Sequence, residues 1–346
     1  MKALVVKGPY NAEFVEVEKP KATGDMALIK IVKAGICATD ISIYTGESSF
    51  VRSGQIKYPV RIGHEWTGVV EEVGENVKNF KKGDRVVSES GVSCGKCAAC
   101  VAGNYSECME IRSVGTVNAW DGCFAEYMLM PERHLYHLAD SITDESAALI
   151  EPTGIAYAAF SNINIGKDTV VAVVGSGAIG MASAWLAKCL GAEKVIMIGR
   201  RDNKLEKAKS VGATSLINNT KCDAVSEIHN LTNGKGVDLI IETTGSEAVL
   251  KDVVKMVANG GTISIISFYE KNLNDFPMDE VVIRHITIKG VAGSFGAPGE
   301  VCKIMEKCDG NPEGIITHRI DFDEVIKFFE NIKDFKEDQI KVMINF

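Results

Sequence analysis

Four cysteines lie close together in a Cys-x-x-Cys-x-x-Cys-x7-Cys run. They are Cys94, Cys97, Cys100 and Cys108. Four thiolates at this spacing can form a closed tetrahedral shell around one zinc ion, which leaves no coordination position for a substrate. A disulfide framework is the weaker interpretation, because Cys-x-x-Cys repeats in a cytosolic chain more often bind metal. We therefore predict a structural zinc site here.

A second group of possible metal ligands begins upstream of the cysteine run. Cys37 is followed by His64 and Glu65, and Glu151 lies further along the chain. Their nitrogen, oxygen and sulfur donors could hold a zinc ion and still leave one position open for chemistry. One chain is thus expected to carry two zinc ions, one in a closed structural site and one in an open catalytic site.

The composition limits the class of protein. A chain of 346 residues can form two domains, each with its own core. Hydrophobic residues make up 46% and charged residues 24%, as in globular proteins. The net charge of −8 argues against a nucleic-acid-binding surface.

The sequence also suggests a compartment. No apolar run approaches the roughly 20 residues that span a bilayer, so we expect no membrane association. Residues 1–7 are predicted to form a strand and not a signal peptide. Ten cysteines without a secretory signal then favour a reducing, cytoplasmic location. Five cysteines outside the metal sets are interpreted as small packing or surface residues, namely Cys123, Cys189, Cys222, Cys302 and Cys308.

The pattern of secondary structure changes along the chain. Up to about residue 150 the sequence is typical of short strands separated by Gly and Asp, for example 69–74 and 82–87. From Asp168 onward, strands and helices alternate, which predicts a parallel sheet with helices on both faces. In this part we predict strands at 169–174, 194–198, 237–242, 262–267 and 286–290, with helices at 182–190 and 301–307. A last strand is predicted at 341–345, in a tail that rejoins the first domain.

A glycine-rich turn follows the strand 169–174 and opens a helix. Its residues are Gly175, Ser176, Gly177, Ala178, Ile179 and Gly180. The first glycine makes the tight turn, the second lets the backbone approach a pyrophosphate, and the third lets the helix pack on the strand. The N–H groups of the helix N-terminus favour phosphate, so the turn predicts a dinucleotide site.

The end of the next strand bears on which dinucleotide binds. An NAD site usually has an acidic residue there, but this chain has Gly199, Arg200 and Arg201. Arginine can bind a 2′-phosphate through two hydrogen bonds, whereas a carboxylate would repel it. NADP is therefore preferred over NAD, although the neighbouring Asp202 complicates the assignment.

Together these motifs resemble the zinc-containing medium-chain alcohol/polyol dehydrogenase family, in its sorbitol and threonine dehydrogenase branch. The resemblance covers essentially the whole chain and includes Gly68, residues 83–86 and the pair Glu151-Pro152. It implies an α/β fold in which a GroES-like β-rich catalytic domain accompanies a Rossmann domain with a doubly wound parallel sheet. We expect the catalytic domain at 1–152 and 290–346 and the Rossmann domain at 153–289.

The resemblance also implies residue roles. Cys37, His64 and Glu151 would be direct ligands of the catalytic zinc, with Glu65 reaching the metal directly or through water. Zinc would lower the pKa of a bound alcohol, whose hydride would pass to the nicotinamide. Thr39 matches the hydroxyl that takes the alcohol proton. The family often has a histidine three residues later, where this chain has Ser42, so the route of the proton to water is open.

The predicted substrate is a polyol or a polyol phosphate. Arg52, Lys57 and Arg61 would complement a phosphate if they point toward the substrate. L-Threonine 3-dehydrogenase activity is the alternative within the enzyme class, and a non-catalytic nucleotide-binding sensor is the alternative outside it. The family also implies a homo-oligomer, a dimer or a tetramer.

Overall fold

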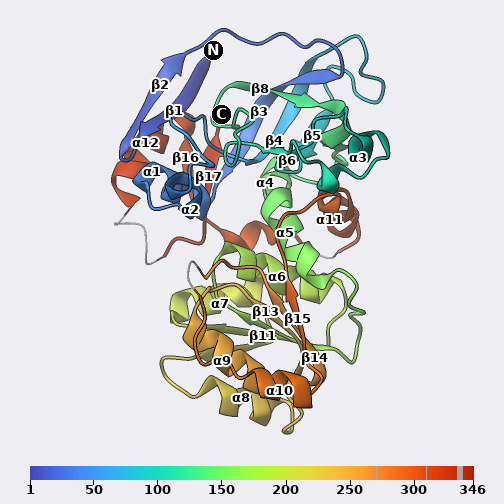
Figure 1. The fold of residues 1–346 in the computed structure, drawn as a ribbon, viewed down its shortest axis with the longest axis vertical. Coiled ribbons are helices and arrows are strands. Elements are labelled where there is room, and N and C mark those ends of the chain that lie inside the picture. Colours follow the sequence, from blue (N-terminus) through green and yellow to red (C-terminus); the bar gives the residue numbers. More distant parts are fainter. Residues whose placement is uncertain (270–271, 309, 333–337) are drawn as a thin grey trace. The chain divides into compact units, whose positions relative to one another are not determined.

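The computed structural model describes residues 1–269, 272–308, 310–332 and 338–346 (Figure 1). The chain divides into two compact units. Unit 1 contains Met1–Glu151, Gly293–Lys307 and Ile316–Phe346, and unit 2 contains Pro152–Ala292 and Cys308–Ile315. The predicted boundaries differ from these units, because they assign Pro152, residues 290–292 and residues 308–315 to the first domain.

Unit 2 is built around a six-stranded parallel sheet. Its order is β12-β11-β10-β13-β14-β15. The strands are β10 (Val170–Val174), β11 (Lys194–Gly199), β12 (Ser215–Asn218), β13 (Val237–Glu242), β14 (Val257–Ile265) and β15 (Thr287–Gly290). The predicted Rossmann-type doubly wound sheet is therefore confirmed, since the first strand lies at the centre and the order reverses beside it.

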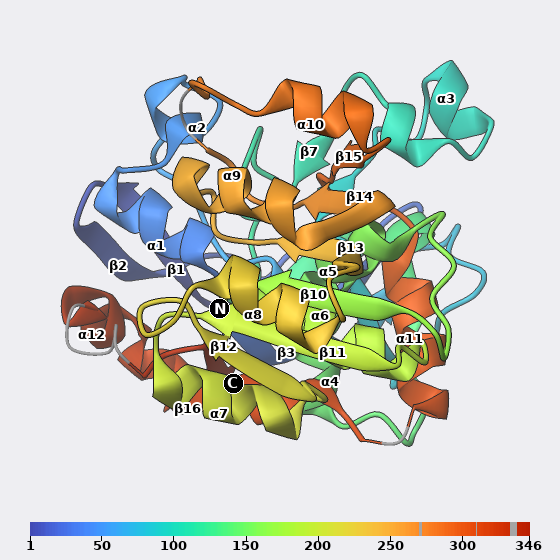
Figure 2. The same cartoon turned by 90° about the horizontal axis from the view of Figure 1, so that it is seen from below.

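Helices cover both faces of this sheet, which explains why its strands are almost continuously apolar. The helices are α5 (Ile150–Phe160), α6 (Ala178–Cys189), α7 (Asp202–Ser210), α8 (Ala224–Leu231), α9 (Glu247–Met256) and α10 (Met278–Ile283). In Figure 1, α6 lies above the sheet and α8 and α9 lie below it, and Figure 2 shows these two on the near side. Alternate strand residues such as Ala172, Val174 and Ile240 pack in one core with Ile228 and Val253 of α8 and α9.

The glycine-rich turn joins β10 to α6 as predicted. Gly175 has a φ of +114°, which side chains rarely adopt. A Cβ on Gly180 would lie 1.8 Å from the carbonyl oxygen of Gly175, so no larger residue fits there. The turn lies at the carboxyl edge of the sheet, where the strand order reverses, which is where ligands bind in open α/β sheets.

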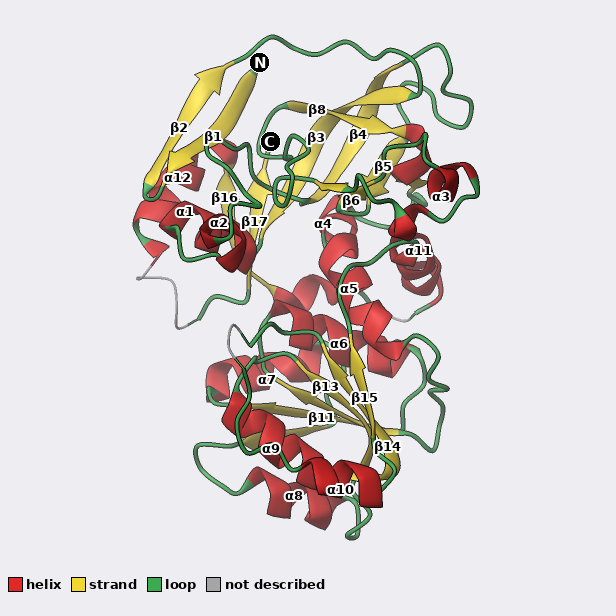
Figure 3. Cartoon of the chain, viewed as in Figure 1, coloured by secondary structure: helices red, strands yellow, loops and turns green. Residues whose placement is uncertain are grey.

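Unit 1 consists mainly of strands and loops (Figure 3). Its seven-stranded sheet has the order β16-β17-β3-β4-β5-β9, with β8 paired to β3. The unit's strands are β1 (Lys2–Gly8), β2 (Asn11–Glu16), β3 (Met26–Ile36), β4 (Glu65–Val73), β5 (Arg85–Ser88), β6 (Gly91–Val92), β7 (Arg112–Ser113), β8 (Tyr127–Pro131), β9 (Leu135–His137), β16 (Ile316–Asp321) and β17 (Lys341–Asn345). The last strand β17 pairs with β3, so the C-terminal tail completes the sheet of unit 1.

The helices of unit 1 are short. They are α1 (Ala38–Thr45), α2 (Ser49–Arg52), α3 (Ala98–Val101), α4 (Asp144–Ala148), α11 (Ala297–Lys307) and α12 (Val325–Glu330). Short 3-10 turns are η1 (Tyr105–Glu107), η2 (Glu132–His134), η4 (Phe322–Glu324) and, in unit 2, η3 (Pro312–Ile315). Among the described residues, no helix combines the length and the apolar character needed to cross a membrane.

Two of the five cysteines that the sequence analysis interprets as small packing or surface residues form a disulfide. Cys189, the last residue of α6, is bonded to Cys308, and the two positions are 119 residues apart. The interpretation as packing or surface residues is therefore corrected for these two, which are covalently bonded. The sequence carries no signal for this pairing, because the two cysteines become neighbours only when the segment Cys308–Ile315 returns to unit 2.

Candidate active site and cofactor site

The structure brings three of the predicted zinc ligands together. Cys37 follows β3 and lies at the N-terminus of α1, whereas Glu65 is the first residue of the neighbouring strand β4 and His64 directly precedes it. Because β3 and β4 are antiparallel, these ends meet, and Gly35 pairs directly with Glu65. The donor atoms of Cys37, His64 and Glu65 all lie within 4.8 Å of one another. A thiolate, an imidazole and a carboxylate are donor types that zinc accepts, so the set fits a zinc ion.

Asp40, which the sequence reasoning missed, fixes the geometry of two of these residues. It is fully buried, and its carboxylate accepts hydrogen bonds from the backbone N–H of Cys37 at 2.8 Å and of Gly63 at 3.1 Å. Its Oδ1 also lies 3.7 Å from Nδ1 of His64. Asp40 thus links the segment that carries Cys37 to the segment that carries His64. Its position three residues after Cys37, in the first turn of α1, was the available signal.

Acidic groups surround the imidazole of His64. Burial lowers the pKa of the imidazole, but Asp40, Cys37 and Glu151 outweigh burial and raise it well above the ordinary value. The buried Nδ1 of His64 has no hydrogen-bond partner among the described residues. A cation at this position would satisfy the same surrounding charges that favour a proton on His64.

Glu65 is also held by a lysine from the far end of the sequence. Nζ of Lys341, on β17, lies 2.6 Å from Oε1 and 2.5 Å from Oε2 of Glu65. Both side chains are buried. A Cβ on Gly35 would lie 2.1 Å from Oε2 of Glu65, so only glycine leaves room for this carboxylate. Glu65 therefore belongs both to the group of candidate metal ligands and to an ion pair.

Glu151 lies near this cluster but is not part of its tight group of donors. It is buried in the first turn of α5. Burial raises the pKa of its carboxyl, while the charge of His64 and a hydrogen bond with Ser90 oppose this shift. The group of donors within 4.8 Å of one another contains Glu65 and does not contain Glu151, and the choice of direct ligand between these two carboxylates stays a prediction.

Thr39 and Ser42 lie on α1, the helix that also carries Asp40. Thr39 is half-buried in the first turn of α1. The hydroxyl of Ser42 donates a hydrogen bond to the carbonyl oxygen of Thr39 at 2.9 Å. In this arrangement the Ser42 hydroxyl is directed to the helix backbone, so it does not replace the histidine of a proton relay.

The four cysteines of the run converge as predicted. Sγ of Cys100 lies 3.4 Å from that of Cys97 and 3.9 Å from that of Cys94, and Cys108 accepts a hydrogen bond from the N–H of Cys94. A tetrahedral shell with zinc–sulfur bonds of about 2.3 Å has sulfur atoms roughly 3.8 Å apart. Burial raises the pKa of Cys100, but hydrogen bonds with Cys97 and Ser93 outweigh it and lower the pKa to about 6. The set can therefore bind one zinc ion.

The glycine-rich turn forms one wall of a cavity of about 460 Å³ in unit 2. Gly175, Ser176 and Gly177 line it at the N-terminus of α6. The other lining residues are Val174, Ile198, Gly199, Arg200, Arg201, Lys204, Asn219, Thr244, Ser246 and Val249. The predicted Ala178, Ile179 and Gly180 lie in the first turn of α6, behind this wall. N–H groups at a helix N-terminus beside a cavity can bind a pyrophosphate, so the cavity fits a nicotinamide dinucleotide.

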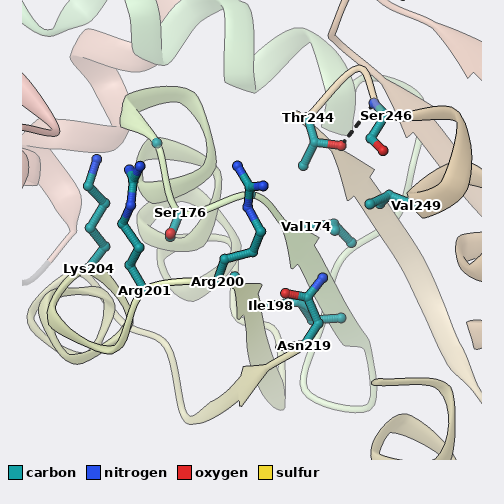
Figure 4. A pocket seen from close by; sticks show the side chains of 13 residues that line it. Val174, Ser176, Ile198, Arg200, Arg201, Lys204, Asn219, Thr244, Ser246 and Val249 are labelled. Atoms are coloured by element: carbon teal, nitrogen blue, oxygen red, sulfur yellow. Dashed lines mark hydrogen bonds between the residues drawn. The ribbon is translucent and has the colours of Figure 1, made fainter. Parts of the chain in front are cut away.

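Three cationic side chains stand along this cavity. In Figure 4, Arg200, Arg201 and Lys204 extend in the same direction from the segment after β11, with Ser176 beside them. Lys204, which the sequence reasoning missed, has only 8% of its surface exposed. The carboxylate of Asp202 binds Asn218 at 2.6 Å and also Lys221. The one acidic residue that complicated the cofactor assignment is thus engaged elsewhere.

The cations that were considered for a substrate phosphate have other contacts. Arg61 has only 10% of its side chain exposed and forms an ion pair with Asp121 at 2.7 Å. Nη1 of Arg52 donates a hydrogen bond to the carbonyl oxygen of Glu47. Lys57 is exposed. This arrangement gives little support to a phosphate site built from these three residues.

Models of two protein families match the chain. The alcohol dehydrogenase GroES-like domain matches residues 23–140, and the zinc-binding dehydrogenase domain matches residues 178–308. Together they span most of the chain, and the first of them includes the four-cysteine run and Cys37, His64 and Glu65, whereas Glu151 lies between the two matched ranges.

Known proteins are similar over almost the full length. An L-threonine 3-dehydrogenase from Bacillus licheniformis is 34% identical over 95% of both chains. A sorbitol dehydrogenase from Bacillus subtilis is 30% identical, covering 99% of this chain and 97% of its own. The crystal structure of a zinc-binding dehydrogenase from Sinorhizobium meliloti 1021, bound to NADP, matches with a TM-score of 0.88 at 26% identity, over 99% of this chain and 98% of the other.

Proposed function

The chain belongs to the zinc-containing medium-chain alcohol dehydrogenase family, and we propose that it oxidises a secondary alcohol of a polyol to a ketone with NADP. The observation that carries this proposal is the convergence of Cys37, His64 and Glu65 in unit 1. The second support is the cation-lined cavity of unit 2. The enzyme class itself, a zinc-dependent NAD(P) alcohol dehydrogenase, follows from the family.

Two zinc ions per chain are part of the proposal. Cys37, His64 and Glu151 would hold the catalytic ion, and Glu65 would lie against it while bound to Lys341. Zinc supplies a Lewis acid that lowers the pKa of an alcohol oxygen. The structural ion would be held by Cys94, Cys97, Cys100 and Cys108. It would stabilise the segment 94–108, in which only Cys100 and Cys108 are buried.

The residues of the chain would handle the proton and orient the reactants. The alcohol carbon would give up its hydrogen as a hydride, which carries two electrons, to the nicotinamide ring, and the alcohol oxygen would release one proton toward the solvent, leaving a ketone. The Thr39 hydroxyl would accept that proton and at the same time release its own proton to water. Ser42 is bound to the helix backbone, so we assign the next step to water or to the ribose hydroxyls of the cofactor.

NADP is the preferred cofactor in this proposal. Arg200, Arg201 and Lys204 line the cavity at the end of β11, where a 2′-phosphate would lie. A dianionic phosphate is stabilised by guanidinium groups that donate two hydrogen bonds each. Asp202, which would repel it, is held by Asn218 and Lys221. The NADP-bound relative from Sinorhizobium meliloti is consistent with this choice.

A free polyol is preferred over a phosphorylated polyol as the proposed substrate. Arg61 is paired with Asp121, and Arg52 is bonded to the backbone of Glu47, so neither is kept for a substrate phosphate. Two carboxylates beside the metal make a polar site that suits several hydroxyl groups. The second candidate is L-threonine, which is favoured by the 34% identity to a threonine dehydrogenase.

The test is the change in nicotinamide absorbance when zinc-loaded protein receives polyols, polyol phosphates or L-threonine, each with NAD and with NADP. The proposal expects the highest kcat/KM for a free polyol with NADP. Cys37→Ser should abolish turnover and leave NADPH binding within about twofold, because the cysteine lies in unit 1 and the cavity in unit 2. Turnover of threonine alone would overturn the polyol assignment. Wild-type turnover by Cys37→Ser would exclude the metal assignment.

We also propose that the protein is a homo-oligomer, a dimer or a tetramer. β15 is the last strand of its sheet, so its outer edge is unpaired among the described strands. The adjacent α10 exposes Met278, Val282 and Ile283, with exposed fractions of 55%, 65% and 72%. An unpaired strand edge beside exposed apolar side chains favours association with another chain. Light scattering after size-exclusion chromatography would test this, and a monomer would contradict it. The cytoplasmic location stays a prediction.

A further inference from the structure

A buried carboxylate lies beneath the cofactor cavity and has no part in the chemistry described so far. Glu242 is the last residue of β13, next to β10 and the glycine-rich turn, and none of its surface is exposed. A carboxylate removed from water is costly unless hydrogen-bond donors surround it. Glu242 lies at the carboxyl edge of a parallel sheet, where ligands bind, so it is placed to act on a ligand site at that edge.

Five donors from two loops converge on Glu242. Oε1 accepts hydrogen bonds from the backbone N–H of Thr244 at 2.6 Å and from the Thr244 hydroxyl. Oε2 accepts from the hydroxyls of Ser267 at 2.6 Å and Tyr269 at 2.7 Å, and from the N–H of Gly245 at 3.4 Å. Thr244 and Gly245 follow β13, whereas Ser267 and Tyr269 follow β14. One side chain therefore joins the loops that leave two neighbouring strands.

The first of these loops is also attached to the glycine-rich turn. The N–H and the hydroxyl of Thr243 both donate to the carbonyl oxygen of Val174, at 3.0 and 2.8 Å. A Cβ on Gly175 would lie 2.2 Å from the Thr243 hydroxyl, so the two segments touch. Thr244 and Ser246 line the cavity opposite Arg200 (Figure 4). The position of this wall thus depends on the residues that Glu242 holds.

The second loop is tied to the first by further bonds. The Ser267 hydroxyl, which donates to Glu242, also accepts the N–H of Gly245 at 2.8 Å. Gly245 has a φ of +65°, and a Cβ there would lie 2.5 Å from the carbonyl oxygen of Phe268. The two loops are therefore packed backbone against backbone around the Glu242 carboxylate, and neither can shift without breaking bonds to it.

We infer that Glu242 is a positioning residue for the nicotinamide cofactor, which sets the cavity wall formed by Thr244 and Ser246 against the glycine-rich turn. It acts through the loops and not by touching the cofactor. This role does not depend on whether NADP or NAD is preferred, because the wall faces the dinucleotide whichever of the two is bound. It differs in this respect from Arg200, whose proposed role is selective for a 2′-phosphate.

The test is Glu242→Gln in the full-length, zinc-loaded protein. The amide places N–H donors where the loops also present donors, so at least one of the five bonds must be lost and the wall must move. Isothermal titration with NADPH and with NADH, well below the melting temperature, should show affinities weaker by about tenfold for both nucleotides, a change equivalent to the loss of one or two hydrogen bonds. Asp252→Asn is the matched control, because Asp252 is an exposed carboxylate of the same unit that pairs with Lys255. It should bind both nucleotides as the wild type does.

The result that overturns the inference is a folded Glu242→Gln protein that melts earlier but binds both nucleotides as tightly as the wild type, since a purely structural role lowers stability alone. A loss confined to NADPH would also overturn it. If Glu242→Gln does not fold, Ser267→Ala with Tyr269→Phe removes two of the five donors and leaves the carboxylate in place. Weaker binding of both nucleotides by this double variant supports the inference, and unchanged binding refutes it.

Discussion

Nζ of Lys341 lies 2.5 and 2.6 Å from the two carboxylate oxygens of Glu65, although 276 residues separate the two positions. The side chains are 3% and 1% exposed, so the pair is isolated from water. Nζ also donates to the carbonyl oxygen of Ile36 at 3.3 Å, next to Cys37. Strand β17 therefore supplies the cation that balances Glu65, one of the candidate metal ligands.

Replacing this lysine should destabilise unit 1. Lys341→Met removes the cation but leaves Glu65 buried and negatively charged, and the loss of one partner from a buried pair costs about 3–5 kcal/mol. We expect the free energy of unfolding to fall by that amount, as measured by chemical denaturation. The double variant Lys341→Met with Glu65→Gln should recover part of the loss, because no unpaired charge remains. A double variant as unstable as the sum of the two single variants would contradict the coupling.

Arg200→Ala should separate the two cofactors. The variant loses a guanidinium that can donate two hydrogen bonds to a 2′-phosphate, so NADPH affinity should fall by about 10- to 100-fold, with little change for NADH. Titration of both nucleotides gives the ratio directly. Arg200→Lys is the control, because it keeps the positive charge but loses the two parallel N–H donors of the guanidinium. Its affinity for NADPH should lie between those of the wild type and Arg200→Ala. Equal losses for both nucleotides would remove the proposed 2′-phosphate contact.

Cys100→Ser should remove one zinc ion and reduce stability more than intrinsic chemistry. Cys100 lies within 3.9 Å of two other sulfur atoms of the run, so its loss opens the four-ligand shell. Elemental analysis should show zinc falling from two ions to one per chain, with an earlier melting transition and kcat of the folded protein retained. Cys222→Ser, at an exposed free cysteine, is the control. Selective loss of kcat at full stability would show that this metal is not structural.

The fold was largely predictable because its signals are local. The apolar run at 169–174, the glycines after it and the next apolar run at 194–198 predict a strand, a turn and a second strand, and the structure has β10, the turn and β11 there. The same holds for Cys94 to Cys108, whose spacing brings four thiols together within one loop. In each case the residues that act together are close in the sequence.

The parts that could not be predicted depend on contacts between distant segments. Lys341 is an ordinary residue of a last strand until β17 pairs with β3 and brings it to Glu65. Glu242 looks like the polar end of an apolar strand, and its five donors come from loops whose approach is set by the sheet. Lys204 lines the cavity only because it lies in the first turn of α7, directly after the end of β11. Periodicity and residue spacing carry no information about contacts between segments that are distant in the sequence.

The disulfide between Cys189 and Cys308 should stabilise unit 2 when oxidised. It closes a loop of 119 residues, and cross-links of about that length stabilise proteins by up to roughly 4–5 kcal/mol by limiting the unfolded chain. A reductant should therefore lower the melting temperature of the wild type and leave that of Cys308→Ser unchanged. Thiol titration of the unfolded, metal-free protein should find eight free thiols before reduction and ten after it, because two of the ten cysteines are bonded. Ten thiols before reduction, with no effect of reductant on melting, would show that the bond does not form under the conditions used.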